Sequence, residues 1–242
     1  MLLVRDMRES TPHEIETLKR IAPVLVLDDM GAGGRLADFT IDLLPVPTEY
    51  REHRAPVRDD LFLYGYSFLH DLEEMGAGEI EKSTDILFYA GADSNAKYLE
   101  QGLALIPAGK SCAVFSGVSS FLAKDGTQTV LGQSDYVRML LSARLLISHF
   151  GITMYEACAA GCAVVAINPT EYHARLCDLA PERFALKNLG VRDRLDSRDA
   201  RAVIAEALEG TKGTPVRPAD VYRGARENLD RFAQILIKMI GK

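Results

Sequence analysis

Residues 140–167, LLSARLLISHFGITMYEACAAGCAVVAI, decide the fold class of this chain. The stretch contains two short apolar runs, at residues 145–147 and 164–167, separated by a glycine, a threonine and a segment of helical pattern. Buried parallel strands have continuous aliphatic sequences because both faces of their sheet are covered, and the connection between two of them is usually a helix. The stretch therefore predicts a strand–helix–strand unit.

Further apolar runs continue this pattern along the chain. They predict strands at residues 1–4, 24–27, 39–44, 86–89, 112–115 and 129–131. Amphipathic segments predict helices at residues 12–21, 95–105, 135–143, 153–160, 197–209 and 219–240. This alternation predicts an α/β fold with mostly parallel sheets.

The segment at residues 45–60 is rich in proline and charge and has no periodicity, which indicates a connector between two lobes. The strands and the one helix expected before it are too few for a complete doubly wound domain. We therefore expect a partial N-terminal α/β lobe at residues 1–55 and a Rossmann-type domain at residues 56–215. A C-terminal helix is expected at residues 216–242.

The composition limits the classes of function. The chain has 242 residues, of which 48% are hydrophobic, and a formal net charge of −6 with scattered basic residues. This composition allows a substantial core and argues against a nucleic-acid partner. No apolar run reaches the ~18–20 residues of a membrane span. The four cysteines form no CxxC pair, which indicates a reducing compartment, so we expect a cytoplasmic protein. No metal and no cofactor are expected.

Ligands of open α/β sheets bind beyond the carboxyl ends of the strands, and three loops at such positions carry suggestive residues. In the first, at residues 89–95, Gly91 would let the main chain approach a ligand and Ser94 could cap the next helix. An ordinary strand-to-helix turn is the other interpretation. In the third, at residues 168–173, His173 could bind a sugar or phosphate or transfer a proton. A surface histidine at a helix start is the alternative.

The second loop, at residues 148–156, has the strongest pattern. Gly151 and Thr153 stand where a helix should begin, so that main-chain N–H groups and a hydroxyl could face a diphosphate. Glu156 follows within the first turns and could accept hydrogen bonds from a ribose diol. The competing interpretation is a capping box formed by Thr153 and Glu156.

Two features near the N-terminus are weaker. Asp28 and Asp29 end a predicted strand and could hold Mg²⁺, although turn residues or helix caps are the more common case. The sequence Gly31-Ala32-Gly33-Gly34 has neither the GxGxxG spacing nor a P-loop lysine. It predicts a turn.

The second loop resembles the core signature of a GT-B subgroup of nucleotide-sugar enzymes. In that subgroup a strand ends in Ser, a Gly-x-Thr loop follows, and Glu lies three residues further on; here these residues are Ser148, Gly151, Thr153 and Glu156. The subgroup includes the lipid II N-acetylglucosaminyltransferase and the UDP-sugar hydrolase of pseudaminic acid synthesis. Other pieces agree in order over about residues 20–180.

The resemblance implies a UDP-sugar ligand on the C-terminal domain. The implied nucleotide-binding residues are Gly91, Asp93, Ser94, Phe115, Ser116, Gly117, Ser148, His149, Gly151, Ile152, Thr153 and Glu156. Among them, the residues from Gly151 to Thr153 would meet the diphosphate and Glu156 the ribose. The loop from Phe115 would meet the base. His173 takes the place of a family glutamine that faces the sugar, and is the candidate catalytic residue.

The chain also departs from the family. The family's N-terminal domain carries its catalytic histidine on a Gly-x-x-His-x-x-Arg-type loop, which has no counterpart here. We therefore expect nucleotide-sugar hydrolysis or glycosyl transfer for surface polysaccharide synthesis, or, alternatively, a non-catalytic GT-B-like binding protein or partner subunit. A homodimer or a partner chain could complete the abbreviated N-terminal lobe.

Overall fold

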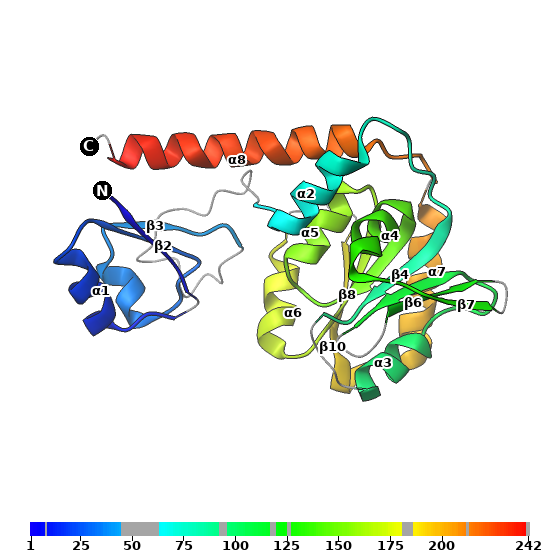
Figure 1. The fold of residues 1–242 in the computed structure, drawn as a ribbon. Coiled ribbons are helices and arrows are strands. Elements are labelled where there is room, and N and C mark those ends of the chain that lie inside the picture. The colour runs from blue at the N-terminus through cyan, green and yellow to red at the C-terminus, as the bar shows by residue number, and fades with distance from the viewer. Residues whose placement is uncertain are drawn as a thin grey trace. The chain divides into compact units, whose positions relative to one another are not determined.

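The structure is a computed structural model that describes residues 1–7, 9–44, 63–91, 96–116, 120–124, 127–180, 186–211 and 213–240. The chain forms two compact units, one of Met1–Leu63 with Arg226–Lys242 and one of Tyr64–Ala225 (Figure 1). We call them unit 1 and unit 2. The expected connector and the boundary near residue 55 fall within residues 45–62, outside the described part of the chain.

Unit 1 is built on a three-stranded parallel sheet in the order β1-β2-β3. Its strands are β1 (Leu3–Asp6), β2 (Val24–Leu27) and β3 (Phe39–Ile41). The helix α1 (Pro12–Lys19) begins with a capping box of Thr11 and Glu14 and packs Ile15 against one face of β2. The opposite face contacts Phe232, Ile235 and Leu236 of α8 (Pro218–Ile240). The C-terminal helix therefore supplies part of the core of unit 1.

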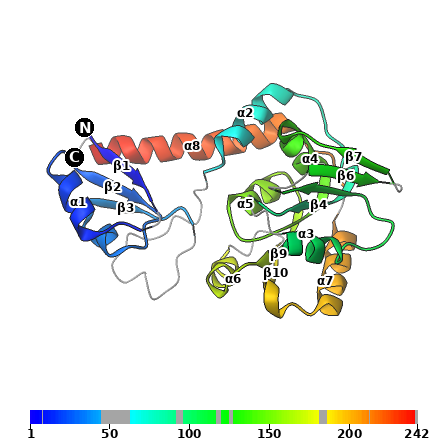
Figure 2. The same cartoon turned by 60° about the horizontal axis from the view of Figure 1, so that its bottom comes forward.

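Unit 2 contains a seven-stranded sheet in the order β10-β9-β8-β4-β5-β6-β7 (Figure 2). The first five strands pair in parallel, and β6 and β7 add an antiparallel extension. The strands are β4 (Thr84–Tyr89), β5 (Cys112–Phe115), β6 (Ser120–Lys124), β7 (Thr127–Val130), β8 (Ala143–Ser148), β9 (Ala163–Asn168) and β10 (Leu186–Val191).

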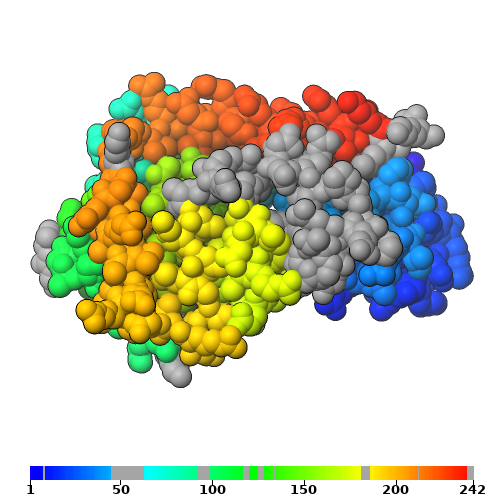
Figure 3. All heavy atoms as spheres, turned by 180° about the vertical axis from the view of Figure 1, so that it is seen from behind, coloured from blue at the N-terminus to red at the C-terminus, as the bar shows by residue number. Residues whose placement is uncertain are grey.

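Helices cover both faces of this sheet. The helices α3 (Ala96–Leu103) and α7 (Ser197–Gly210) pack on one face, where Leu99, Ile204 and Leu208 join the aliphatic side chains of the strands. Figure 2 shows α2 (Tyr66–Met75), α4 (Tyr136–Ser142) and α5 (Ile152–Ala159) on the other face. The helix α6 (Glu171–Asp178) contacts β9 and β10. Seen from behind, the outer side of α7 lies on the molecular surface (Figure 3).

The predicted α/β fold with mostly parallel sheets is confirmed, since every strand pair in the described chain is parallel except β5-β6 and β6-β7. The strands at residues 24–27 and 112–115 have the predicted bounds. The strands β6 and β10 and the helix α2 were not predicted. Both strands are largely half-buried and so lack the continuous aliphatic sequence of the central strands. Within the described residues, no helix combines the length and hydrophobicity needed to cross a bilayer.

Candidate functional site

The strand order of unit 2 creates a switch point between β4 and β8. From β4 the chain passes through α3 to β5 on one side, whereas β8, on the other side of β4, is followed by α5 on the opposite face of the sheet. The loops after two such strands diverge, and ligands of open α/β sheets bind in the crevice between them. The predicted loops at residues 89–95 and 148–156 follow β4 and β8, and the predicted loop at residues 168–173 follows β9.

Gly91 and His149 meet at this switch point. Gly91 has a φ of +68°, and a Cβ atom placed on it would lie 3.0 Å from Nε2 of His149. The Nδ1 atom of His149 lies 3.0 Å from the carbonyl oxygen of Phe150. Because a carbonyl oxygen only accepts, Nδ1 carries the proton in this bond, and Nε2 is the nitrogen directed toward Gly91.

The loop after β8 is anchored by buried polar groups. The hydroxyl of Ser148, which is fully buried, donates to the carbonyl oxygen of Tyr89 at 3.0 Å and so ties the end of β8 to the end of β4. The main-chain N–H of Phe150 donates to Oδ1 of Asn168 at 2.9 Å. The Phe150 ring is buried and contacts Tyr155 edge-on. The buried residues Ser148 and Phe150 therefore anchor the loop to the sheet. His149 and Gly151 are only partly buried and remain accessible on its outer side.

The start of α5 is open. Its N-cap is Gly151, with an extended main chain, and no side chain caps the helix. The predicted alternative of a capping box formed by Thr153 and Glu156 is therefore wrong, because the Glu156 side chain makes its hydrogen bonds elsewhere. Ile152 is 46% exposed despite its apolar side chain. An uncapped helix start with main-chain N–H groups and a positive dipole end suits an anionic group.

Glu156 is buried and points to the starts of two other helices. Its Oε1 accepts a hydrogen bond from the N–H of Gly65, the N-cap of α2, at 3.1 Å. Its Oε2 accepts one from the hydroxyl of Tyr136, the first residue of α4, at 3.2 Å. Burial raises the pKa of Glu156 above its ordinary value, and these two hydrogen bonds oppose the shift.

Tyr136 belongs to an aromatic cluster that sequence reasoning missed. Its ring centroid lies 5.2 Å from that of Tyr89 and 5.6 Å from that of Phe115, at the carboxyl ends of β4 and β5. The Thr153 side chain also forms a hydrogen bond with the Tyr136 hydroxyl. The sequence did contain a signal for the position of Tyr136, because a helix that leads into a parallel strand begins at the carboxyl edge of the sheet. The helix predicted at residues 135–143 leads into the strand at 145–147 and so had to place its first residues there.

His173 lies in the first turn of α6 and faces the same edge. Its ring is 6.4 Å from the ring of His149, in a T-shaped arrangement, and its Nδ1 is 2.7 Å from the Thr170 hydroxyl. Thr170 also caps α6 by accepting from the His173 N–H. The structure thus brings Gly91, His149 and His173 together through their contacts, and joins Phe115, Thr153 and Glu156 through Tyr136. Ser116 follows β5 and is buried.

Three of the predicted site residues, Asp93, Ser94 and Gly117, lie outside the described residues. In unit 1, Asp28 and Asp29 both use carboxylate oxygens to accept main-chain N–H groups, from Leu43 and Leu44 and from Ser10 and Gly31 respectively. These contacts are those of turn residues. Within the described ranges, no group of three His, Cys, Asp or Glu side chains has the proximity needed to hold a metal ion.

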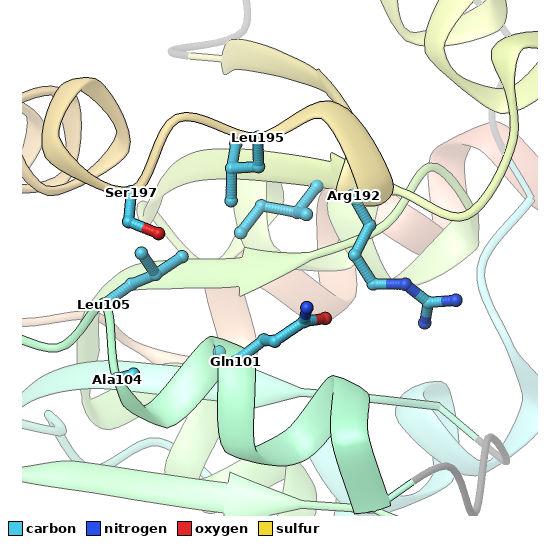
Figure 4. Close-up of a pocket in the computed structure, with 8 residues that line it drawn as sticks. Gln101, Ala104, Leu105, Arg192, Leu195 and Ser197 are labelled. Carbon is cyan, nitrogen blue, oxygen red and sulfur yellow. The ribbon is translucent and has the colours of Figure 1, made fainter.

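A separate cavity of about 130 Å³ lies in unit 2 between α3 and the segment that leads from β10 into α7 (Figure 4). Pockets for ligands of drug or cofactor size usually measure about 300–1,000 Å³, so this cavity is too small for a nucleotide sugar. None of the described site residues lines it. The side chains that do include Gln101, Leu105, Ile167, Arg192, Leu195 and Ser197.

No protein-family model and no curated protein matches the sequence. Among solved structures, the chain is similar to the glycotransferase of kitacinnamycin, with a TM-score of 0.55 and 10% identity over 98% of this chain and 75% of that one. The chain has a GT-B-like fold. It also aligns with CalG4, the calicheamicin glycosyltransferase, with a TM-score of 0.49 and 14% identity over 100% of this chain and 73% of that one. The predicted GT-B-like fold class is confirmed, while identities this low establish the fold alone.

Proposed function

We propose that unit 2 binds a UDP-sugar at the carboxyl edge of its sheet and that the protein acts in nucleotide-sugar hydrolysis or glycosyl transfer. The observation that carries this proposal is the open main chain at the switch point, where Gly91 lies against His149 and the uncapped α5 begins at Gly151. The fold likeness to a glycosyltransferase is compatible with this chemistry, while the site itself is argued from its residues.

In this proposal the diphosphate lies on the N–H groups at Gly151, Ile152 and Thr153, with Gly91 and its loop on the other side. The positive end of α5 stabilises the negative charge that develops on the departing diphosphate. Glu156 accepts from the ribose, since two lone pairs of its carboxylate remain beyond the bonds to Gly65 and Tyr136. The base lies toward Phe115 and Ser116.

The proton acceptor for water or a sugar hydroxyl is His173 or His149, which lie side by side at this edge. A histidine is suited to this role because its ordinary pKa is close to neutral pH. The resemblance to the enzymes of lipid II and pseudaminic acid synthesis makes UDP-activated amino sugars the first substrates to try.

Gly151→Ala tests the binding site without disturbing the fold. A Cβ atom at Gly151 would have no atom within 4 Å, and its extended main chain suits any residue. The methyl group would instead obstruct the approach of a diphosphate to the helix start. Isothermal titration should show micromolar binding of UDP but not of CMP to the wild type. The variant should bind UDP at least about tenfold more weakly, since a hydrogen bond to a charged group contributes about 1.5–3 kcal/mol.

Gly210→Ala is the matched control, because a Cβ there also meets no atom within 4 Å and the residue ends α7, away from the loop. It should bind UDP like the wild type. Equal affinities of all three proteins for UDP would place the nucleotide elsewhere, and absence of UDP binding to the wild type would refute the proposal.

A turnover assay distinguishes an enzyme from a protein that only binds the nucleotide sugar. The wild type is incubated with UDP-N-acetylglucosamine, and release of UDP is measured for it and for His173→Gln and His149→Gln. Release that falls at least about 100-fold in one variant, with UDP affinity kept, would assign the catalytic base to that residue. UDP binding without release of UDP from any UDP-amino sugar, whether water is the only acceptor or a sugar acceptor is added, would favour the alternative, a non-catalytic binding protein or partner subunit.

A further inference from the structure

Tyr136 occupies the centre of the hydrogen-bonded and aromatic contacts at this edge. Its ring contacts those of Tyr89 and Phe115. Its hydroxyl donates to Oε2 of Glu156 at 3.2 Å and forms a hydrogen bond with the Thr153 side chain, both on α5. The ring contacts hold the hydroxyl in place. The hydroxyl in turn restricts the two side chains of α5 that the proposed function assigns to the ligand.

The other carboxylate oxygen of Glu156, Oε1, is also held by a hydrogen bond. It accepts the N–H of Gly65, and a Cβ atom at Gly65 would lie only 3.1 Å from that oxygen. A glycine at this position therefore allows the helix α2 to begin directly against the carboxylate. With one donor on each oxygen, the plane of the carboxylate is fixed.

We propose that Tyr136 is a positioning residue of the ligand-binding edge, which holds the Glu156 carboxylate in the orientation needed for a ribose diol. This inference rests on the proposed function, because it concerns the same ligand. Tyr136 acts through Glu156 and Thr153 and needs no contact with the ligand itself.

The electrostatics agree with this geometry. Burial raises the pKa of Glu156, and the hydrogen bonds from Gly65 and Tyr136 favour its ionised form. Burial, and then the negative charge of Glu156, raise the pKa of Tyr136 above its ordinary value, so its hydroxyl remains a donor at neutral pH. The groups that face Glu156 are the N–H of Gly65 from α2 and the hydroxyl of Tyr136 from α4. Burial raises the pKa of Glu156, and these two donors lower it.

Tyr136→Phe tests the inference because it keeps the ring and its packing and removes only the hydroxyl. The Glu156 carboxyl is titrated by carbon NMR, and UDP affinity is measured from pH 5 to pH 8. We expect the titration midpoint of Glu156 to rise, and the pH below which UDP affinity declines to rise with it. At neutral pH, UDP affinity should fall about tenfold, in line with the loss of a hydrogen bond to a charged group.

Tyr66→Phe is the matched control, since it removes a hydroxyl from a tyrosine side chain that is 82% exposed. It should leave both the Glu156 titration and the UDP affinity unchanged. Glu156→Gln is a second variant, which should remove the titration and the associated pH dependence of binding together.

The outcomes are distinct. An unchanged Glu156 midpoint in Tyr136→Phe would overturn the inference, and so would a shifted midpoint with unchanged UDP affinity, which is the result of a purely structural contact. If the wild type fails to bind UDP, the proposed function fails, and the ligand role of Tyr136 fails with it. The NMR titration still decides, without any ligand, whether Tyr136 controls the ionisation of Glu156.

Discussion

The two units use glycine-containing loops after a buried parallel strand in opposite ways. In unit 1 the loop Gly31-Ala32-Gly33-Gly34 follows β2, and a Cβ atom at Gly31 or Gly33 would overlap the main chain of Ser10 or Thr11. In unit 2 Gly151 follows β8, and a Cβ atom there would meet nothing within 4 Å. Glycine therefore serves internal packing in the first loop and leaves the main chain accessible in the second.

Hydrogen bonds show the same difference. In the unit 1 loop the N–H of Gly33 donates to Ser10, that of Gly34 to Gly31, and that of Gly31 to the buried carboxylate of Asp29. In unit 2 no side chain caps the helix that starts after Gly151. A loop that uses its donors internally has none left for an anion, so glycine content alone does not indicate a phosphate site.

The largest effect on stability should come from Gly33→Ala. The added methyl group would overlap the carbonyl of Thr11, which is main chain and cannot rotate away. Overpacking of this kind costs about 1–3 kcal/mol and occasionally more, and we expect the upper part of that range. Urea denaturation followed by hydrogen exchange at β1 and β2 would measure it. A free energy of unfolding within about 0.5 kcal/mol of the wild type, the range of ordinary surface changes, would contradict the close packing of this loop.

Gly91→Ala should have an intermediate effect. A non-glycine residue at a φ of +68° costs about 1–2 kcal/mol, and the Nε2 of His149 at 3.0 Å must also move. Gly109→Ala separates the two contributions, because Gly109 has a φ of +77° with no atom within 4 Å of an added Cβ. Thermal denaturation of both variants should show the larger loss for Gly91→Ala. Equal losses would mean that His149 yields without cost.

A smaller, pH-dependent effect is expected for Glu156→Gln. Burial raises the pKa of Glu156 above 4.5, so the folded protein holds this proton more tightly than the unfolded chain. Its contribution to stability is therefore present below pH 4.5 and is lost as the pH rises through the folded-state pKa. The wild type should lose stability relative to the variant over this window, by at most about 1.4 kcal/mol per pH unit.

Urea midpoints measured from pH 4 upward for both proteins would give this difference, in which the shifts of other groups cancel. The exposed Glu206 provides the control, and Glu206→Gln should follow the wild type at every pH. A constant difference between wild type and Glu156→Gln across the window would show that burial does not shift the pKa of Glu156.

The smallest effect on stability is expected for Gly151→Ala. The methyl group meets no atom and the main chain is extended, so stability should stay within about 0.5 kcal/mol of the wild type or rise slightly through the lower entropy of the unfolded chain. A melting temperature equal to those of the wild type and Gly210→Ala would confirm it. A large loss would mean that the loop after β8 is packed like the one in unit 1, and would remove the contrast between them.

The sequence by itself determined the α/β fold class and the location of the loops at the carboxyl edge. These features depend on local patterns: aliphatic runs such as residues 164–167, and glycine near a helix start such as Gly151. The half-buried strands β6 and β10 escaped prediction because tertiary pairing, rather than hydrophobic sequence, holds them in the sheet.

Only the tertiary structure decided what each polar side chain does. Thr153 and Glu156 have the spacing of a capping box, yet Glu156 bonds to Gly65, which is 91 positions away in the sequence, and to Tyr136. Asp28 and Asp29 are adjacent, yet they accept main-chain N–H groups from different segments. The physical reason is that a buried carboxylate is stabilised by whichever donors the packed fold brings near it, and sequence spacing does not record them.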